Sequence, residues 1–440
     1  MTINTSKPLF QSIPVKNRSP KSKSIIRLIN FNVLFFISLL LLHSTQLIFF
    51  PLIFFKSGFN GFFWKLNSFA KQVFGIVLVV ATQIFGPTKL VITVDDGIDL
   101  RQMVKRDKSG RVISLDLPKR SVTMANHQIY ADWLYIWCLA YLAEIHGSII
   151  IILKASLKWV PIIGPAMQLF SFIFLNRSWA SDKSSLIEHL TTMAKQTSST
   201  SKLKPNQAFE SLTLLIFPEG TLVSPLTRPI SQKYAEKTGF TDLKHCLLPR
   251  STGTLFCIRA LSRSIPDLQL IDLTIGYPGI PAYGNGQDFY TLQSIFGYGH
   301  SPPQVHIHLR LIPISSIPIG TSHLNPSSTS SSSSTPATEI IDPSPSETIE
   351  FDKWLREQWR MKDEMLERFY KTGEMCEGSK EEEKEDKNEM EDLVMTRKVI
   401  TKVRLRGNYD WLILLGLYGP GILLVWIGSI WFMIAFKRIF

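Results

Sequence analysis

The chain has 440 residues, enough for one large domain or two, and 45% of them are hydrophobic. It carries 48 Lys and Arg against 36 Asp and Glu, a net charge of +12, which suits a protein that lies against anionic lipid and handles phosphorylated ligands. Nucleic acid is a poorer match, because no basic stripe interleaved with aromatic residues occurs. The four cysteines form no C-x-x-C pair, so neither a zinc site nor a redox pair is indicated.

The N-terminal part predicts a basic tail followed by a membrane segment. Residues 1–24 form the tail, and residues 25–55 form an apolar run whose only charged residue is Arg27. This run is long enough to cross a bilayer and too long for the apolar part of a signal peptide, and its basic flank favours a cytosolic N-terminus. A further run from Val73 to Gly86 is too short to span comfortably. We therefore expect residues 25–86 to form a membrane hairpin or a re-entrant segment.

Residues 88–316 have the pattern of an α/β domain, with a central sheet flanked by helices. Short apolar and β-branched runs predict strands, and helical patterns lie between them, at 132–145 and 181–194. Residues 304–311 alternate between apolar and polar side chains, which predicts a half-exposed strand with His306 and His308 on one side. We favour a solvent-facing strand over a metal site there, because no third ligand is evident nearby.

The composition changes several times after the α/β domain. Residues 321–347 are rich in Ser, Thr and Pro, which predicts a disordered linker, and residues 351–370 predict a helix. Residues 374–410 begin with an unpatterned acidic stretch and are expected to form a charged tether. The last apolar run, residues 411–436, carries no charge and is long enough to span a bilayer. Its Gly- and Pro-rich centre leaves a single pass and a tight hairpin both open.

A first candidate site is the stretch Asn126-His127-x4-Asp132. On one continuous helix the side chains of His127 and Asp132 would point about 140° apart and could not meet. They can meet if His127 lies in a turn and Asp132 in the first turn of the following helix, and the strand-like residues 120–125 make this arrangement plausible. The Asp would then hold the imidazole in one tautomer and leave its other nitrogen free as a general base.

Two further motifs occur where predicted strands end. Residues 216–221 read Ile-Phe-Pro-Glu-Gly-Thr, and a simple turn would explain the Pro and Gly but not Glu219 between them. Residues 172–177 end an apolar strand with Arg177, whose fork of donors suits a phosphate. Taken singly, each motif is weak evidence of function.

Together and in this order, the motifs resemble those of the glycerolipid acyltransferases, which esterify glycerol-3-phosphate and lysophospholipids from acyl-CoA. The N-H-x4-D block of that family matches Asn126, His127 and Asp132, and its F-P-E-G-T block is intact at residues 217–221. The block that ends in Arg matches residues 174–177, with Ser171 where the family often has Gly, and residues 271–278 match the fourth block. Other stretches, at 154–167, 175–183, 248–254 and 354–364, look like the subgroup that acylates lysophosphatidylinositol, lysocardiolipin and lysophosphatidate.

The resemblance implies a role for each matched residue. His127 would remove the proton from a glycerol hydroxyl as that oxygen attacks the acyl-CoA carbonyl, and Asp132 would fix and polarise the imidazole. The implied substrate-binding residues are Asn126, Lys154, Arg177, Glu219, Gly220, Thr221 and Arg250, with Arg177 on the acceptor phosphate. Acyl-CoA is a co-substrate, and neither a metal nor another cofactor is expected. The expected partners are a lysophospholipid, acyl-CoA and the endoplasmic reticulum membrane, with the catalytic domain facing the cytosol.

Two other functions remain as alternatives. A lysophospholipid or acyl-CoA hydrolase would usually need a nucleophile, and the chain contains no G-x-S-x-G sequence. A non-catalytic membrane tether would be expected to have lost the His, Asp or Glu of the motifs, and all three are present.

Overall fold

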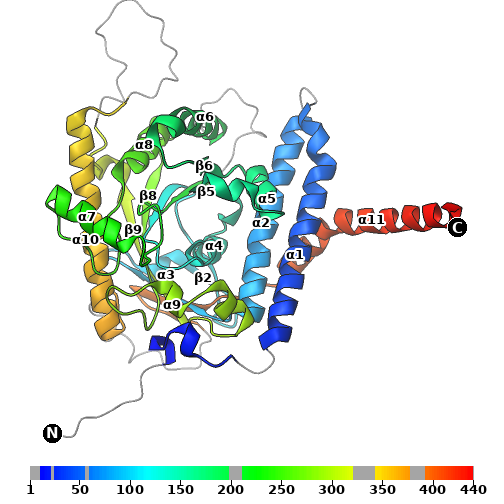
Figure 1. Ribbon diagram of the computed structural model, residues 1–440, viewed down its shortest axis with the longest axis horizontal. Coiled ribbons are helices and arrows are strands. Elements are labelled where there is room, and N and C mark those ends of the chain that lie inside the picture. The colour runs from blue at the N-terminus through cyan, green and yellow to red at the C-terminus, as the bar shows by residue number, and fades with distance from the viewer. Residues whose placement is uncertain are drawn as a thin grey trace, which may run out of the picture.

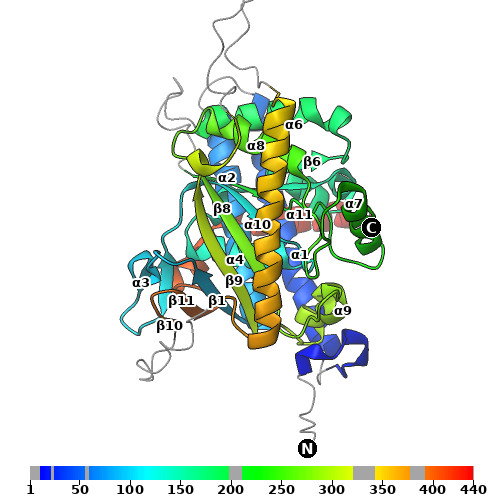
Figure 2. The same cartoon turned by 90° about the vertical axis from the view of Figure 1, so that its left-hand side faces the viewer.

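A mixed sheet forms the centre of the molecule, which is described here by a computed structural model for residues 10–20, 24–54, 59–197, 211–320, 342–376 and 392–439. Within these residues the sheet has nine strands in the order β10-β11-β1-β9-β8-β4-β7-β5-β6, and helices cover both faces (Figures 1 and 2). The predicted α/β fold is confirmed. The strands of this sheet are β1 (Lys89–Val94), β4 (Arg120–Ala125), β5 (Ile149–Lys154), β6 (Ile173–Leu175), β7 (Leu212–Ile216), β8 (Gln269–Gly276), β9 (Gln304–Pro313), β10 (Leu393–Val394) and β11 (Lys398–Lys402).

Five neighbouring strands, β8, β4, β7, β5 and β6, run parallel to one another. Met124 of β4 pairs with Ile216 of β7, so the segments that follow these two strands leave the sheet side by side. Both strands are buried almost throughout, as their apolar and β-branched sequences require. The parallel register therefore brings the N-H-x4-D and F-P-E-G-T motifs to the same edge of the sheet.

Helix α10 lies across β8 and β9 on one face of the sheet, and α2 and α4 pack together behind the sheet (Figure 2). The last two are buried on most sides, which suits their apolar sequences. The longer helices are α1 (Ser24–Phe49), α2 (Phe59–Phe85), α4 (Asp132–Leu142), α5 (Ile163–Leu169), α6 (Trp179–Thr197), α7 (Arg228–Thr238), α8 (Ser251–Ser262), α10 (Pro345–Thr372) and α11 (Asn408–Ile439). Two single turns, α3 (Leu100–Met103) and α9 (Gly286–Phe289), and a separate pair of strands, β2 (Val104–Arg106) and β3 (Val112–Leu115), complete the elements used below.

Two expectations about individual elements are wrong. Strand β9 is not half-exposed, because it lies between β1 and β8 and α10 covers its polar side. His308 is fully buried and bonds to Asp95 and Thr93, so it does not face solvent. The run that was expected to start at Val73 belongs to α2, a helix of 27 residues. Helix α2 starts before Val73 because Asn67 and Lys71 do not end it and are instead buried against the rest of the protein.

The segments outside the expected α/β domain are more ordered than their composition indicates. Residues 10–17 of the basic tail form two short 3₁₀ turns, η1 (Phe10–Ser12) and η2 (Val15–Asn17), and η2 contacts α9. Part of the expected tether, residues 392–402, forms β10 and β11, which extend the sheet beside β1. Residues 377–391, and 321–341 of the predicted linker, lie outside the described residues.

Both C-terminal helices differ in length or form from the expectation. Helix α10 starts at Pro345 instead of residue 351, because Ser344 and Glu347 form a capping box at its first turn. Helix α11 is a single continuous helix, so the tight hairpin is not adopted. It points away from the body of the molecule, across the direction of α1 and α2 (Figure 1).

Candidate active site

His127 and Asp132 meet in the arrangement that the sequence predicted. His127 lies in the turn after β4, and Asp132 is the first residue of α4. The Nδ1 atom of His127 is 2.8 Å from Oδ2 of Asp132. The Nε2 atom of His127 makes no hydrogen bond within the described part of the chain, and the side chain is 18% exposed, whereas that of Asp132 is fully buried. An imidazole held at one nitrogen and open at the other is the geometry of a general base.

The surroundings of Asp132 hold its carboxylate in one orientation. Oδ2 also accepts hydrogen bonds from the backbone N–H groups of Gln128 and Ile129, at 2.6 and 3.0 Å. Oδ1 accepts a hydrogen bond of 2.6 Å from the hydroxyl of Tyr277, which follows β8. Four donors surround a buried carboxylate, so the anion is compensated without a cationic partner.

Glu219 of the F-P-E-G-T motif is hydrogen-bonded to the N-H-x4-D motif. Its Oε1 accepts hydrogen bonds from the backbone N–H of His127 at 3.0 Å and from Nε1 of Trp359 at 3.3 Å, and its Oε2 accepts one from the N–H of Leu247 at 3.1 Å. The side chain is buried, and burial raises the pKa of Glu219 to about 8, although the three N–H donors favour the anion. These contacts give Glu219 a positioning role, where the sequence predicted a contact with substrate.

Asn126 is another residue with structural contacts where the sequence predicted a contact with substrate. Its Nδ2 donates to the carbonyl of Ile275 at 2.9 Å, and its Oδ1 accepts from the N–H of the same residue at 2.7 Å. Asn126 is fully buried and clamps the end of β4 to the end of β8. The side chain is already paired and is out of reach of solvent, so the contacts in this structure give it a structural role, and its contact with substrate stays a prediction.

The other residues of the F-P-E-G-T motif lie around His127. The ring of Phe217 stacks on the imidazole, with the ring centres 4.3 Å apart. Gly220 has a φ of +69°, in the region that favours glycine, and a Cβ there would lie 3.7 Å from the side chain of Arg250. Thr221 follows it, partly exposed.

Three cations lie at the same end of the sheet as His127. Lys154 ends β5, Arg177 follows β6, and Arg250 precedes α8. Within the described residues none of their side chains forms an ion pair or a hydrogen bond, although Arg177 and Arg250 are close enough to repel each other. Burial and this repulsion lower the pKa of Arg177 from its usual value. Neighbouring guanidinium groups without a carboxylate between them fit a phosphate.

The backbone at Arg177 is held in an unusual conformation. Its φ is +66°, and the carboxylate of Asp182 accepts hydrogen bonds from the N–H groups on either side, of Asn176 at 2.9 Å and Ser178 at 3.0 Å. Ser171 has a φ of +60° just after the last turn of α5. A residue at this place in a helix end is usually Gly, which explains the glycine that the family often has there.

Helix α10 supplies site residues to which the sequence analysis assigned no role. Besides the bond from Trp359 to Glu219, the carboxylate of Asp363 accepts hydrogen bonds from the N–H groups of Lys244, His245 and Cys246. Lys362 is buried and pairs with Asp272 of β8. The spacing Trp359-x-x-Lys362-Asp363 was visible in the sequence, but its partners lie more than 80 residues away and gave no local signal.

Comparison with known proteins agrees with this geometry. A family model described as Acyltransferase matches residues 111–275. An uncharacterized acyltransferase of Schizosaccharomyces pombe is 32% identical over 309 residues, which cover 70% of this chain and 76% of the relative. The 2-acyl-1-lysophosphatidylinositol acyltransferase of Saccharomyces cerevisiae is 32% identical over 324 residues, covering 69% and 75%. Lysocardiolipin acyltransferase 1 of Danio rerio is 31% identical over 256 residues, covering 58% and 53%. Taken with the His127–Asp132 pair, these likenesses show that the chain belongs to the glycerolipid acyltransferase family.

Proposed function

We propose that the protein is an acyl-CoA-dependent O-acyltransferase that esterifies a glycerol hydroxyl of a lysophospholipid with a phosphorylated or inositol-bearing head group. The observation that carries this proposal is the His127–Asp132 pair, with Nε2 of the imidazole open and the cations Arg177 and Arg250 without partners among the described residues. The named relatives support a lysophospholipid acceptor, since they include a lysophosphatidylinositol and a lysocardiolipin acyltransferase.

The proposed reaction needs only this chain's own groups. Nε2 of His127 takes the proton of the acceptor hydroxyl while the oxygen attacks the thioester carbonyl, and base assistance of this kind is typically worth about 10² to 10⁴ in rate. The tetrahedral intermediate then expels the CoA thiolate, which recovers the proton from the imidazolium. Asp132 stabilises that imidazolium, and Arg177 and Arg250 hold the acceptor phosphate.

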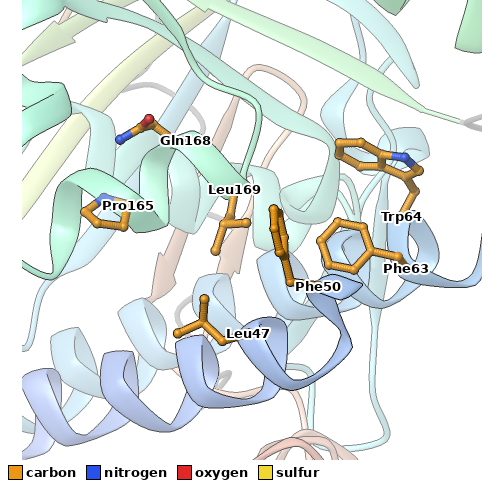
Figure 3. Close-up of a pocket in the computed structure, with 7 residues that line it drawn as sticks. All are labelled: Leu47, Phe50, Phe63, Trp64, Pro165, Gln168 and Leu169. Atoms are coloured by element: carbon orange, nitrogen blue, oxygen red, sulfur yellow. The ribbon is translucent and has the colours of Figure 1, made fainter. Parts of the chain in front are cut away.

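We further propose that α1 and α2 lie along the surface of a bilayer and do not cross it. Two spans, Ser24–Leu52 and Phe62–Phe85, are long and apolar enough to cross, but residues of the α/β domain flank the pair at both ends. At one end Phe31 of α1 stacks on Phe296, with ring centres 4.5 Å apart. At the other end a cavity of about 400 Å³ separates Leu47 and Phe63 from α5 (Figure 3). A bilayer could not surround the pair without also burying these parts of the domain.

The exposed side of α1 fits this placement. It is mostly apolar, with exposed hydrophobic side chains at helical spacing that include Ile25, Ile29, Val33, Ile37, Leu40 and Leu47, although Asn30 is exposed as well. Helix α11 includes the uncharged residues 411–436 and points away from the body, so it is our candidate for the single crossing.

The tail and the α/β domain are proposed to share the cytosolic side of the endoplasmic reticulum. Phe10 packs on His300, and the guanidinium of Arg18 lies over the rings of Phe10 and Tyr290. A tail that contacts the domain lies on the same side of the membrane as the domain. The cytosolic side follows because acyl-CoA is charged and cannot cross a bilayer unaided.

A competition assay tests the acceptor class. Purified protein in detergent or vesicles receives labelled oleoyl-CoA with equal amounts of lysophosphatidylinositol, lysocardiolipin, lysophosphatidate and glycerol-3-phosphate. We expect one of the three lysolipids to carry most of the label. Preferential labelling of glycerol-3-phosphate would place the protein in another subgroup, and CoA release without any acceptor would indicate a hydrolase.

A further inference from the structure

Among the described residues, Tyr277 is the one side chain outside the motif turn that bonds to the catalytic carboxylate. It follows β8, 145 positions from Asp132 along the chain, and its hydroxyl donates to Oδ1 at 2.6 Å. The other three donors, including His127, all bond to Oδ2. Tyr277 therefore holds Oδ1, the oxygen that does not face the imidazole, and it fixes the rotation of the Asp132 carboxylate about the Cβ–Cγ bond.

Towards the carboxylate the phenol is a neutral donor. Tyr277 is fully buried, and burial together with the Asp132 carboxylate raises its pKa well above the usual value. It therefore stays protonated across the working pH range. A short bond from a neutral donor to a buried carboxylate withdraws negative charge from that carboxylate. Less charge then remains to stabilise a proton on His127.

The position of Tyr277 is fixed by its neighbours. Its ring lies 5.8 Å from that of Tyr290, whose hydroxyl donates to the carbonyl of Pro278 at 2.7 Å. Arg18 of the N-terminal tail covers Tyr290, and Gly279, with a φ of +90°, lets the backbone of Gln11 approach closely. The loop that carries Tyr277 is thus fixed by contacts with Tyr290 and with the N-terminal tail.

We infer that Tyr277 is a positioning residue of the transferase reaction, which sets both the orientation of Asp132 and the pH at which His127 becomes an active base. The inference rests on the proposed function, in which His127 is that base. Among the described residues, the ionisable groups that act on Tyr277 besides Asp132 are Tyr135 and Tyr370, and those that act on Asp132 include His127 and Glu219. The ring of Tyr290 packs on that of Tyr277, and Arg18 acts on Tyr290. None of these donates to Oδ1, so Tyr277→Phe removes the only side-chain donor to that atom among the described residues.

Tyr135→Phe is the matched control. Tyr135 lies one turn along α4, its ring is 6.0 Å from that of Tyr277, and it is equally buried. Its hydroxyl has no hydrogen-bond partner within the described residues. Both variants delete one buried hydroxyl from the same cluster, but only Tyr277→Phe deletes a bond to the carboxylate.

Two measurements on the full chain test the inference. The first is kcat and KM against pH: we expect Tyr277→Phe to lower kcat about tenfold, with both KM values within about twofold, and to move the acid limb to higher pH by roughly half a unit or more. The second follows carbethoxylation of His127 by diethylpyrocarbonate against pH, with peptide mapping by mass spectrometry, and needs no substrate. Its midpoint should move in the same direction, while Tyr135→Phe leaves both profiles unchanged.

The outcomes separate the inference from the proposed function. If wild-type protein transfers no acyl group to any lysolipid, the proposed function fails, and the carbethoxylation profile still decides the role of Tyr277. Unchanged profiles in Tyr277→Phe, or equal changes in both variants, would overturn the inference. So would a loss of activity through KM alone. If Tyr277→Phe does not fold, replacing Tyr277 by 3-fluorotyrosine keeps the shape with a stronger donor and should move both midpoints to lower pH.

Discussion

The pairing of His127 with Asp132 predicts how the variant Asp132→Asn should behave. The amide oxygen can take the place of Oδ2 and still accept the hydrogen bonds from His127, Gln128 and Ile129. Tyr277 can turn its hydroxyl to accept from the new amide group. The variant should therefore fold, with a melting temperature close to that of the wild type. What it loses is the negative charge beside the imidazolium that forms during the reaction.

The size of that loss follows from the geometry. With Nδ1 and Oδ2 2.8 Å apart, the centres of the two charges lie about 4 Å apart. Two unit charges at that distance attract by about 4 kcal/mol at an effective dielectric constant of about 20. Since about 1.4 kcal/mol corresponds to a tenfold change in rate, kcat should fall about 10³-fold.

The assay measures CoA release and label transfer from oleoyl-CoA for Asp132→Asn, His127→Ala and the double variant. Because the two residues act as one unit, the double variant should be little slower than His127→Ala. If the loss of kcat in the double variant equals the product of the two single losses, His127 and Asp132 do not act as one unit. More than about a tenth of wild-type activity in His127→Ala would refute the general-base role itself.

Three other predictions concern the acceptor, Glu219 and the membrane. Arg177→Lys keeps the charge but loses the guanidinium fork, so the KM for the lysophospholipid should rise about tenfold while the KM for acyl-CoA stays unchanged. An unchanged KM for the lysophospholipid would place the phosphate site at Arg250 and Lys154 instead. Glu219→Gln puts an amide against N–H donors, so kcat should fall at least tenfold. Because burial raises the pKa of Glu219 to about 8, the folded wild type keeps a proton that the unfolded chain has released, and the wild type should lose stability relative to the variant as pH rises from about 5 to 8. Denaturation curves measure this difference, and parallel pH profiles for the two proteins would contradict it. Glycosylation tags at residue 5 and within 321–347 should lie on the same, cytosolic side of sealed endoplasmic reticulum vesicles, and tags on opposite sides would exclude the surface placement of α1 and α2.

The local parts of the site could be predicted from the sequence. A strand that ends at Ala125 and a helix that begins at Asp132 leave a turn in which His127 must lie, and that pattern spans only a few residues. The matching end of β7 likewise placed Glu219 at a strand terminus. Such features depend on backbone preferences over one or two elements, which a single sequence carries.

Tertiary partners could not be predicted in the same way. The sequence near Asn126 does not indicate that its side-chain amide will bond to both the C=O and the N–H of Ile275. The sequence near Glu219 does not indicate that Leu247 and Trp359 will donate hydrogen bonds to its carboxylate. The burial of polar residues in α2 is unpredictable for the same reason. The apolar run starts at Val73 in the sequence, but α2 includes Lys71, which the fold buries.

The most direct test of the account is the fate of the acyl group in one reaction. Purified protein is given oleoyl-CoA labelled in the acyl chain and a single lysophospholipid, the best acceptor of the competition assay, and the products are separated. We expect label in the diacylated phospholipid, CoA released in equal amount, and less than about a tenth of either product with His127→Ala. Labelled free oleate formed with or without the lysolipid would contradict it.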